Sequence, residues 1–564
     1  MKQMKKVITI MAISVALQAA VPNAPRIGDV IREAQVPKEL TQKKKKPLVE
    51  IKGVKPVHKP QLKNSKNFKR VFVKSFSIEG NSHIKNEKLI ALLKKYKNKK
   101  LSFNDMQIVA SIITSAYRKD GYIVARAYIP VQNMNDGVLQ IVVIEGVYGK
   151  FKLTNNSRVK ISLIQSMLDT TKSANVINNS SLERTLLLVN ELPGVVVTNA
   201  SIEAGKNIGS SDFLITTDSS NFYDGYLLAN NYGGRYTGEN QLIGGVNINS
   251  PFKIGDKLSL VGFVSNGANL KNGSVSYDFP LYNNGLRGEI GYYKTFYSLT
   301  KEFANLDAVG TAQSYYVKVN YPLIKQRQQD LEIYIKAERG TLRDEIRSTN
   351  FNSLKYVNVY RLGLDYDIKD LKLFNINQEL RTSMILTYGD LKFANATQSA
   401  LDKASVDTEG HYSKIALSLK YNINLTNSFT LENSLKYQHA LGHKNLDGSE
   451  DFAVGGAYGA ILYPTGELSA ENGYLVKIEA KQILPSIFSI SHSAGLFYDT
   501  GHASMENPTA TFKSRTLQDV GISYYAYYKK FFLNAKIAWK IDNEEITSEP
   551  DANYKLLVMG GFSF

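Results

Sequence analysis

From residue 224 to residue 564, the sequence is a succession of segments in which apolar and polar residues alternate, and helical periodicity is missing. The alternation is clearest where Leu533, Ala535, Ile537, Trp539 and Ile541 are separated by Asn534, Lys536, Ala538 and Lys540. Segments of about 9–13 residues with this alternation have the length of tilted membrane-crossing strands, with an apolar outer face and a polar inner face. Because lipid offers the backbone no hydrogen-bond partner, strands can span a membrane only as a closed barrel.

Sixteen candidate strands can be counted in this region, and they begin near residues 224, 239, 257, 270, 285, 310, 329, 354, 376, 411, 429, 473, 489, 516, 530 and 553. The connections after odd-numbered strands include the long ones, at 296–309, 342–353, 390–410, 440–472 and 500–515. Several connections after even-numbered strands are short. Long outer loops and short periplasmic turns are typical of bacterial outer-membrane barrels, whereas a soluble β-sandwich needs no such asymmetry. The sequence therefore predicts an all-β transmembrane barrel of 16 antiparallel strands over residues 218–564.

The beginning of the chain predicts export. Three lysines precede the apolar run Val7–Leu17, and small residues follow at positions 19 and 20. This pattern is typical of a secretory signal peptide, here residues 1–20. The chain contains no cysteine, which excludes disulfides and cysteine nucleophiles. The formal net charge of +18 partly reflects lysine runs in one segment. No recognition helix or zinc spacing accompanies that charge, so nucleic acid is not an expected partner.

Residues 25–35 predict a short amphipathic helix. Ile27, Val30, Ile31 and Ala34 recur at helical spacing and form one apolar stripe. So short a helix is marginal alone and needs a surface or a cavity in which to dock. Residues 36–70 carry a lysine run and four prolines with few large apolar residues, and this composition predicts an extended linker.

Two compact units of similar order are predicted next. In residues 71–147, a strand over Val71–Glu79 precedes helices over Asn86–Lys94 and Asn104–Lys119 and two β-rich segments, 122–129 and 137–145. Residues 148–217 repeat this β-α-α-β-β order, with helices expected over Val159–Leu168 and Ser181–Asn190. Periodicity alone supports a pair of small α+β domains.

One glycine-rich segment, residues 452–474, interrupts the alternating strands after the eleventh candidate. Its glycines permit backbone shapes that other residues resist, and its tyrosines and proline are too apolar for an ordinary solvated tip. The residues of interest are Gly455, Gly456, Tyr458, Gly459, Ile461, Tyr463 and Pro464.

Several separated stretches carry motifs of a known family. They are DGYIVARAYIPVQNMNDGVLQIVVIEG at 120–146, LERTLLLVNELPGVVV at 182–197, NNYGGRYTGENQLIGGVNINSPFKIGDKL at 230–258, GGAYGAILYPTGELSAENGY at 455–474 and FYDTG at 497–501. In this order they resemble the TpsB-type two-partner secretion transporters of the haemolysin/haemagglutinin secretion family. The first two resemble the ends of that family's two POTRA domains. The other three resemble its first barrel hairpin, its sixth outer loop and its F-x-D-x-G barrel strand.

The resemblance implies a protein of a Gram-negative-type outer membrane, with a plug helix at 25–35, a linker, two periplasmic POTRA domains and a sixteen-stranded barrel. It implies a large secreted exoprotein, of adhesin or haemolysin type, as the partner. Contacts with outer-membrane lipid and, during biogenesis, with the barrel-assembly machinery are also implied. The last strand, with Phe562 and Phe564, resembles the recognition end used in that assembly.

In the family, the sixth loop folds into the lumen, and an arginine at its tip pairs with the aspartate of the F-x-D-x-G strand. Here that aspartate is Asp499, close to Gly501, but Ile461 stands at the arginine position. An isoleucine makes no charge-assisted bond, so Asp499 needs another cation, backbone donors or lumen water. The loop is expected to enter the lumen through Tyr458, Tyr463 and its glycine turns, held less by charge than by packing.

The expected function is export of an unfolded partner, recognised by the POTRA domains, without ATP. The nearest glycine–lysine sequence, Gly146–Lys150, lacks the phosphate-loop spacing. A barrel-insertion machine of the same superfamily and a passive porin are the alternatives. Metalloprotease and nucleophile-elbow motifs are missing, so neither an enzyme nor a catalytic, metal or cofactor site is expected.

Overall fold

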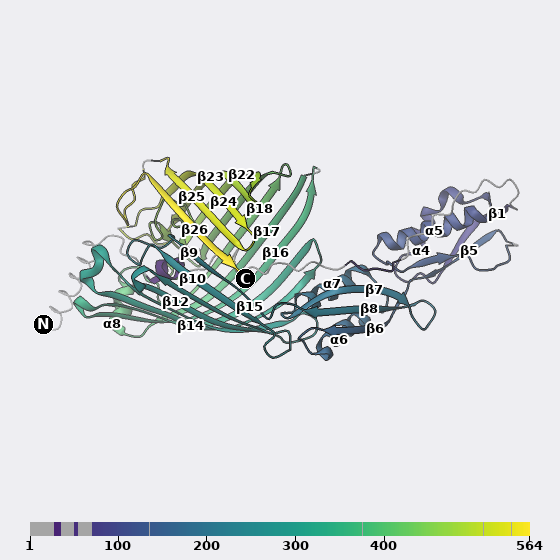
Figure 1. The fold of residues 1–564 in the computed structure, drawn as a ribbon, viewed down its shortest axis with the longest axis horizontal. Helices are drawn as coiled ribbons and strands as arrows, with labels where there is room; N and C mark the ends of the chain where they lie inside the picture. Colours follow the sequence, from purple (N-terminus) through teal and green to yellow (C-terminus); the bar gives the residue numbers. More distant parts are fainter. Residues whose placement is uncertain are drawn as a thin grey trace.

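The computed structural model describes residues 27–34, 50–54, 70–134, 136–374, 376–510, 512–542 and 544–564. A large β-barrel lies at one end, two α/β units extend from it in a row, and a short helix lies inside the barrel (Figure 1). The predicted signal peptide and most of the predicted linker fall outside the described residues.

The barrel is one closed antiparallel sheet of sixteen strands, in which the last strand pairs with the first. The strands are β9 (Tyr223–Asn230), β10 (Gln241–Asn249), β11 (Lys257–Ser265), β12 (Leu270–Pro280), β13 (Arg287–Ser298), β14 (Ala308–Lys325), β15 (Gln329–Ile346), β16 (Phe351–Leu373), β17 (Ile376–Phe393), β18 (Gly410–Asn424), β19 (Phe429–Leu441), β22 (Asn472–Ile487), β23 (Ile490–Ser504), β24 (Arg515–Tyr528), β25 (Phe531–Lys540) and β26 (Tyr554–Ser563). The predicted fold class and strand number are confirmed, and every strand begins within three residues of its predicted start.

Several strands are longer than predicted. β14, β15 and β17 have 18 residues each and β16 has 23, so these hairpins continue well beyond a membrane-spanning length. The predicted long loop 342–353 is therefore wrong, because β15 and β16 remain paired until residues 346 and 351. Cross-strand hydrogen bonds persist after the strands leave the lipid, and alternation alone does not mark that end.

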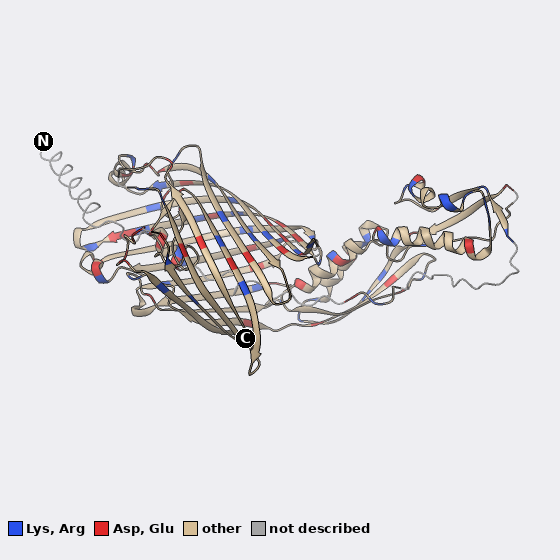
Figure 2. Cartoon of the chain, turned by 90° about the horizontal axis from the view of Figure 1, so that it is seen from above, with Lys and Arg blue, Asp and Glu red and all other residues tan. Residues whose placement is uncertain are grey.

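The two faces of the barrel differ as the alternation predicts. On β25, Leu533 and Trp539 belong to one set of alternating residues and are exposed, whereas Ala538 belongs to the other set and is buried. The same outward exposure of large apolar side chains recurs around the barrel, at Leu242, Leu260, Ile290, Val317, Ile335, Leu362, Leu386, Leu417, Leu435, Ile478, Leu496, Ile522 and Leu556. Basic and acidic residues are interspersed along the strands (Figure 2). An apolar outside and a charged inside suit a barrel in lipid around a wet lumen.

The first α/β unit has a three-stranded sheet in the order β2-β5-β4, covered by helices, and a separate β1-β3 pair. Its elements are β1 (Val71–Val73), β2 (Ser75–Glu79), α4 (Asn86–Leu92), η1 (Lys94–Tyr96), β3 (Lys99–Leu101), α5 (Phe103–Lys119), β4 (Arg126–Tyr128) and β5 (Val138–Ile144). The single strand predicted over Val71–Glu79 is split, because its first part pairs with β3 and its second with β5. The second predicted helix begins with a capping box between Ser102 and Asp105.

In the second unit, the sheet order is β6-β8-β7, with two helices on one face. The elements are β6 (Val147–Asn156), α6 (Ile161–Thr170), η2 (Thr171–Ala174), α7 (Asn179–Glu191), β7 (Val195–Ala204) and β8 (Ser210–Ser219). This β-α-α-β-β order is the one predicted for the second unit. In the first unit, β3 lies between the two helices and was not predicted.

The second unit is bound to the last residues of β14. Arg184 Nη2 donates to the carbonyl of Pro322 at 2.6 Å, and Lys325 Nζ lies 2.7 Å from a Glu191 carboxylate oxygen. These contacts come from α7, so this end of the barrel is the one that faces the α/β units (Figure 1).

Candidate functional site

The segment between β19 and β22 folds back into the barrel. Two short strands, β20 (Phe452–Ala453) and β21 (Ser469–Ala470), pair at its base. Beyond them the chain packs against the inner faces of β22, β23 and β24 in one apolar cluster. The loop contributes the buried residues Val454, Ala460, Ile461, Leu462, Tyr463 and Leu468 to this cluster, and the wall contributes Leu475, Phe497 and Leu517.

Close backbone contacts fix the shape of this loop. A side chain at Gly455 would place its Cβ 2.2 Å from the carbonyl oxygen of Pro464, and one at Gly459 would meet the carbonyl of Val454 at 2.0 Å. Gly456 has φ +100°, a backbone shape that other residues rarely adopt. The wall is equally tight, because a Cβ at Gly501 would lie 2.6 Å from Cγ1 of Val454.

The aromatic residues singled out in the loop have different surroundings. Tyr463 is fully buried, and its hydroxyl donates to Asp542 Oδ1 at 2.7 Å. Tyr458 remains partly exposed, meets the ring of Tyr232 edge-on, and its carbonyl accepts a bond from Lys436. Ile461 lies in the apolar cluster and is 1% exposed.

Asp499 forms an ion pair with a lysine of the barrel wall. Lys477 stands directly opposite Asp499 in the β22–β23 register, and its Nζ lies 2.7 Å from Asp499 Oδ2. The same ammonium donates to the carbonyl of Gly459 at the loop tip. Asp519 stands opposite Asp499 on the other side, in β24, and accepts a 2.8 Å bond from the amide of Leu462. The cation that pairs with Asp499 is thus a lysine of the wall, and the loop tip offers backbone groups.

Lys477 and Asp519 were not identified from the sequence. A usable signal existed, since both occupy polar inward positions of strands adjacent to the one carrying Asp499. Using it requires the exact pairing register, which only the assembled sheet supplies.

Charged pairs also hold the base of the loop. Glu450 bonds Lys414 at 2.8 Å and Arg361 at 3.0 Å, and Asp447 bonds Lys355 at 2.5 Å. On the other side, the carboxylate of Glu467 pairs with Arg515 of β24. The sequence predicted that packing would dominate, but ion pairs from several wall strands contribute as well.

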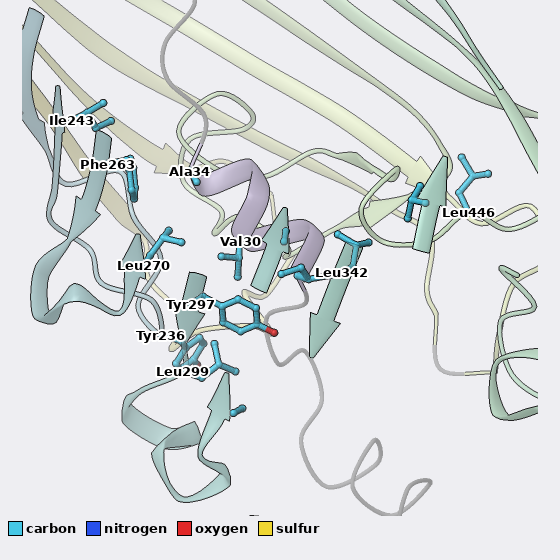
Figure 3. Close-up of a cluster of buried hydrophobic side chains, with 14 of the residues drawn as sticks. Val30, Ala34, Tyr236, Ile243, Phe263, Leu270, Tyr297, Leu299, Leu342 and Leu446 are labelled. Atoms are coloured by element: carbon cyan, nitrogen blue, oxygen red, sulfur yellow. The ribbon is translucent and has the colours of Figure 1, made fainter. Parts of the chain in front are cut away.

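Helix α2 (Ile27–Glu33) lies inside the barrel, as Figure 3 shows. Val30 is fully buried and Ile27 and Ala34 nearly so, in a cluster with Tyr236, Tyr297 and Leu342 of the barrel. The predicted apolar stripe makes this contact, and Ile31 packs at its edge.

The polar face of α2 is covered too, by the sixth loop between β19 and β22 and by the connection between β9 and β10. Arg32 donates to the carbonyls of Gly448 at 3.0 Å and Asp451 at 3.3 Å. Glu33 accepts a bond from the hydroxyl of Thr237. Burial raises the pKa of Glu33 to about 7, with nearby Asp29 and Glu549 acting in the same direction against the hydrogen bond from Thr237. Helix and loop form one packed assembly within the lumen.

The two terminal aromatic residues lie at the barrel seam. The backbones of Phe564 and Gly225 exchange two hydrogen bonds, of 2.9 and 3.1 Å. The ring of Phe562 packs between those of Phe531 and Phe564. These residues therefore help to close the last strand onto the first.

Within the described ranges, no group of three or more His, Asp or Glu side chains is placed to hold a metal ion. Across the same ranges, no helix is both long and apolar enough to cross a membrane.

A closed barrel with periplasmic α/β units, an inward loop and an internal helix defines an outer-membrane transporter of the POTRA-bearing class. Two family models match the sequence: the ShlB-type POTRA domain over residues 71–146, and the haemolysin secretion/activation protein family ShlB/FhaC/HecB over residues 209–524. The chain belongs to this family of two-partner secretion transporters, which lie in the outer membrane with their POTRA domains in the periplasm.

Known proteins resemble the chain over most of its length. The heme/hemopexin transporter protein HuxB of Haemophilus influenzae strain 86-028NP is 26% identical over 476 residues, which cover 82% of each chain. The structure of CdiB from Escherichia coli superposes with a TM-score of 0.72 at 17% identity, over 90% of this chain and 92% of that one. BamA from Haemophilus ducreyi lacking POTRA domains 1–3 has a TM-score of 0.51 at 14% identity, over 88% of this chain and all of that one, which shows a shared fold.

Proposed function

We propose that this protein exports one large exoprotein across the outer membrane, recognising it in the unfolded state through its POTRA domains and using no ATP. The observation that carries the proposal is the pairing of a family-typical barrel with two α/β units, the second of which is held at the periplasmic mouth by α7. A passive porin needs no such units.

Recognition is proposed to occur by strand addition. β2 and β4 are the outer strands of the first unit's sheet, and β6 and β7 those of the second. Outer strands carry backbone groups that an extended polypeptide can pair with, at little cost in sequence specificity. The first unit also exposes Phe72 and Phe103, which suit a client with apolar side chains.

Transport without ATP is proposed because the sequence offers no phosphate-binding loop, and folding of the client outside the cell can make the movement one-way. The charged lumen wall suits an extended hydrated chain. HuxB and CdiB are named as transporters, which favours this class over an enzyme.

The resting pore is proposed to be closed by α2 together with the sixth loop, since both are packed into the lumen. Removal of residues 25–35 is expected to raise single-channel conductance in planar bilayers. Unchanged conductance would mean that this helix is not a plug.

Outer-membrane lipid around the apolar belt and the barrel-assembly machinery are the other proposed partners. Phe562 and Phe564 are the proposed recognition end, and their place at the seam suits a signal read while the barrel closes. A barrel-insertion machine is the alternative function, favoured by the fold shared with BamA.

The decisive experiment deletes residues 71–217 and follows secretion of the exoprotein encoded by the neighbouring reading frame. The barrel should still assemble, as judged by its mobility on gels before and after heating, and secretion should stop. Continued secretion would refute the proposal. If general outer-membrane barrel assembly fails instead, the insertion machine is the better function.

A further inference from the structure

A short piece of the predicted linker is paired with the second unit. Lys52 N donates to the carbonyl of Ala200 at 2.9 Å, and the amide of Ile202 donates to the carbonyl of Lys52 at 3.0 Å. These bonds make Lys52 the parallel partner of Ser201 in β7. Residues 50–54, called the clasp segment below, therefore lie beside the outer strand of the β6-β8-β7 sheet.

Two side-chain features fit the clasp segment to this position. Ile51 packs against the core cluster of the second unit, whereas Lys52 is exposed. Gly53 has φ +88°, and a Cβ there would lie 2.5 Å from the carbonyl of Ile202. Only glycine allows this close approach without strain.

The contact is small for a permanent element of a sheet. The described part of the segment makes one bridge with two backbone hydrogen bonds, while β7 and β8 pair over nine positions. A strand from another polypeptide that pairs along more of β7 would make more bonds than the clasp segment does.

We propose that the clasp segment is a resident strand on β7 and that a strand of the exported polypeptide takes its place there. The inference rests on the proposed function and adds its regulation: the client must displace part of the transporter itself. A competing internal strand multiplies the apparent association constant of the client by the fraction of time that β7 is free, so binding weakens as the clasp segment is paired more of the time. It also masks an outer strand that would otherwise invite unrelated chains. The clasp segment, which the client displaces from β7, follows α2 along the chain.

A reversible lock tests the exchange. Because the chain has no cysteine, Lys52→Cys with Ser201→Cys creates a single defined pair at neighbouring positions, within reach of a disulfide. The probe is the N-terminal fragment of the exoprotein encoded by the neighbouring reading frame, bound to the full-length transporter in detergent. The oxidised protein should bind this fragment at least about tenfold more weakly than the same protein after reduction.

Two controls separate this effect from a general effect of cross-linking. Each single-cysteine variant should bind equally before and after reduction. The pair Asn156→Cys with Asp218→Cys joins β6 to β8, where the two residues are register partners, and leaves β7 uncovered. Its oxidation should not change binding.

A second variant tests the opposite direction. Ile51→Ser removes the apolar anchor of the clasp segment, so the fragment should bind several-fold more tightly. Lys52→Ser changes an exposed side chain of the same segment and should leave binding unchanged. Tighter binding is not expected if Ile51 only stabilises the unit.

Equal binding by the oxidised and reduced double-cysteine protein would overturn the exchange, as would weaker binding by Ile51→Ser. Failure of the two thiols to form a disulfide would contradict the position of the clasp segment. If the unaltered transporter neither binds nor secretes this exoprotein, the proposed function fails instead.

Discussion

Lys477, which pairs with Asp499 and with the carbonyl of Gly459, gives a quantitative test of how the sixth loop is held. Lys477→Met removes the cation next to Asp499 but keeps most of the side-chain volume. Asp499 is fully buried, and its paired oxygen is 2.7 Å from the ammonium that also holds the carbonyl of Gly459. Loss of one partner of a buried pair costs ~3–5 kcal/mol, and the lower end applies because Lys477 retains some exposure.

Most of this destabilisation should disappear when the loop opens, because lumen water then reaches Asp499. The variant should therefore open more often, by about 10²-fold for ~3 kcal/mol. Opening can be measured with one introduced thiol, Val454→Cys, since this side chain is fully buried in the loop and the chain has no other cysteine. The rate of maleimide labelling of the folded barrel then reports the open fraction.

The double variant Lys477→Met with Asp499→Leu provides the control. With Asp499 removed as well, its buried carboxylate no longer lacks a cation, and Asp519 keeps its hydrogen bond from the amide of Leu462. Labelling should therefore return to within about tenfold of the reference rate. An unchanged rate in the single variant, or an equally fast rate in the double variant, would refute the account of Lys477 as the loop's cation.

Three further predictions concern the plug, the loop and the first unit. Glu33 has a pKa of about 7 when α2 is docked and the ordinary value of 4.5 when it is not, so docking of α2 weakens by up to ~3 kcal/mol as the pH rises from 4.5 to 7. Single-channel conductance should rise over this pH range. If Glu33→Gln shows the same pH profile as the unaltered protein, the reasoning is contradicted. Gly455→Ala places a Cβ against the carbonyl of Pro464 and should destabilise the closed loop by ~1–3 kcal/mol, which speeds maleimide labelling at Val454→Cys. The control Gly262→Ala adds a Cβ in open space and should leave the labelling rate unchanged. In the first unit, burial alone would raise the pKa of Glu145, but hydrogen bonds from Ser82, His83 and Tyr117 lower it to about 2, so its contribution to stability is present above about pH 4.5 and is lost as pH falls towards 2. Glu145→Ala should therefore lower the local opening free energy of this turn by ~2 kcal/mol and speed amide hydrogen exchange at Ser82 and His83 by roughly 30-fold. Unchanged exchange at these two amides would show that the carboxylate does not hold this turn.

The sequence by itself predicted the barrel strands, their number and the order of elements in the second α/β unit, whereas in the first unit it missed β3 between the two helices. The predicted features are local properties, because alternation with a period of two and helical spacing are written in neighbouring residues. The same reasoning missed the extra length of β15 and β16 and the split of the strand at Val71–Glu79, where pairing with distant strands decides the boundaries.

The contacts of the lumen were decided by tertiary structure alone. The resemblance predicted that Ile461 stands at an arginine position and left the cation for Asp499 open. That cation is Lys477, which becomes its neighbour only in the β22–β23 register. Asp519 meets the loop tip across 57 residues of sequence, and Thr237 meets Glu33 across 204. Such pairs follow from closure of the barrel and from entry of helix and loop into its lumen. Alternation assigns Lys477, Asp499 and Asp519 to the inner face, but a two-residue shift in register keeps that face and changes the partner. The pairing therefore follows only from the assembled sheet.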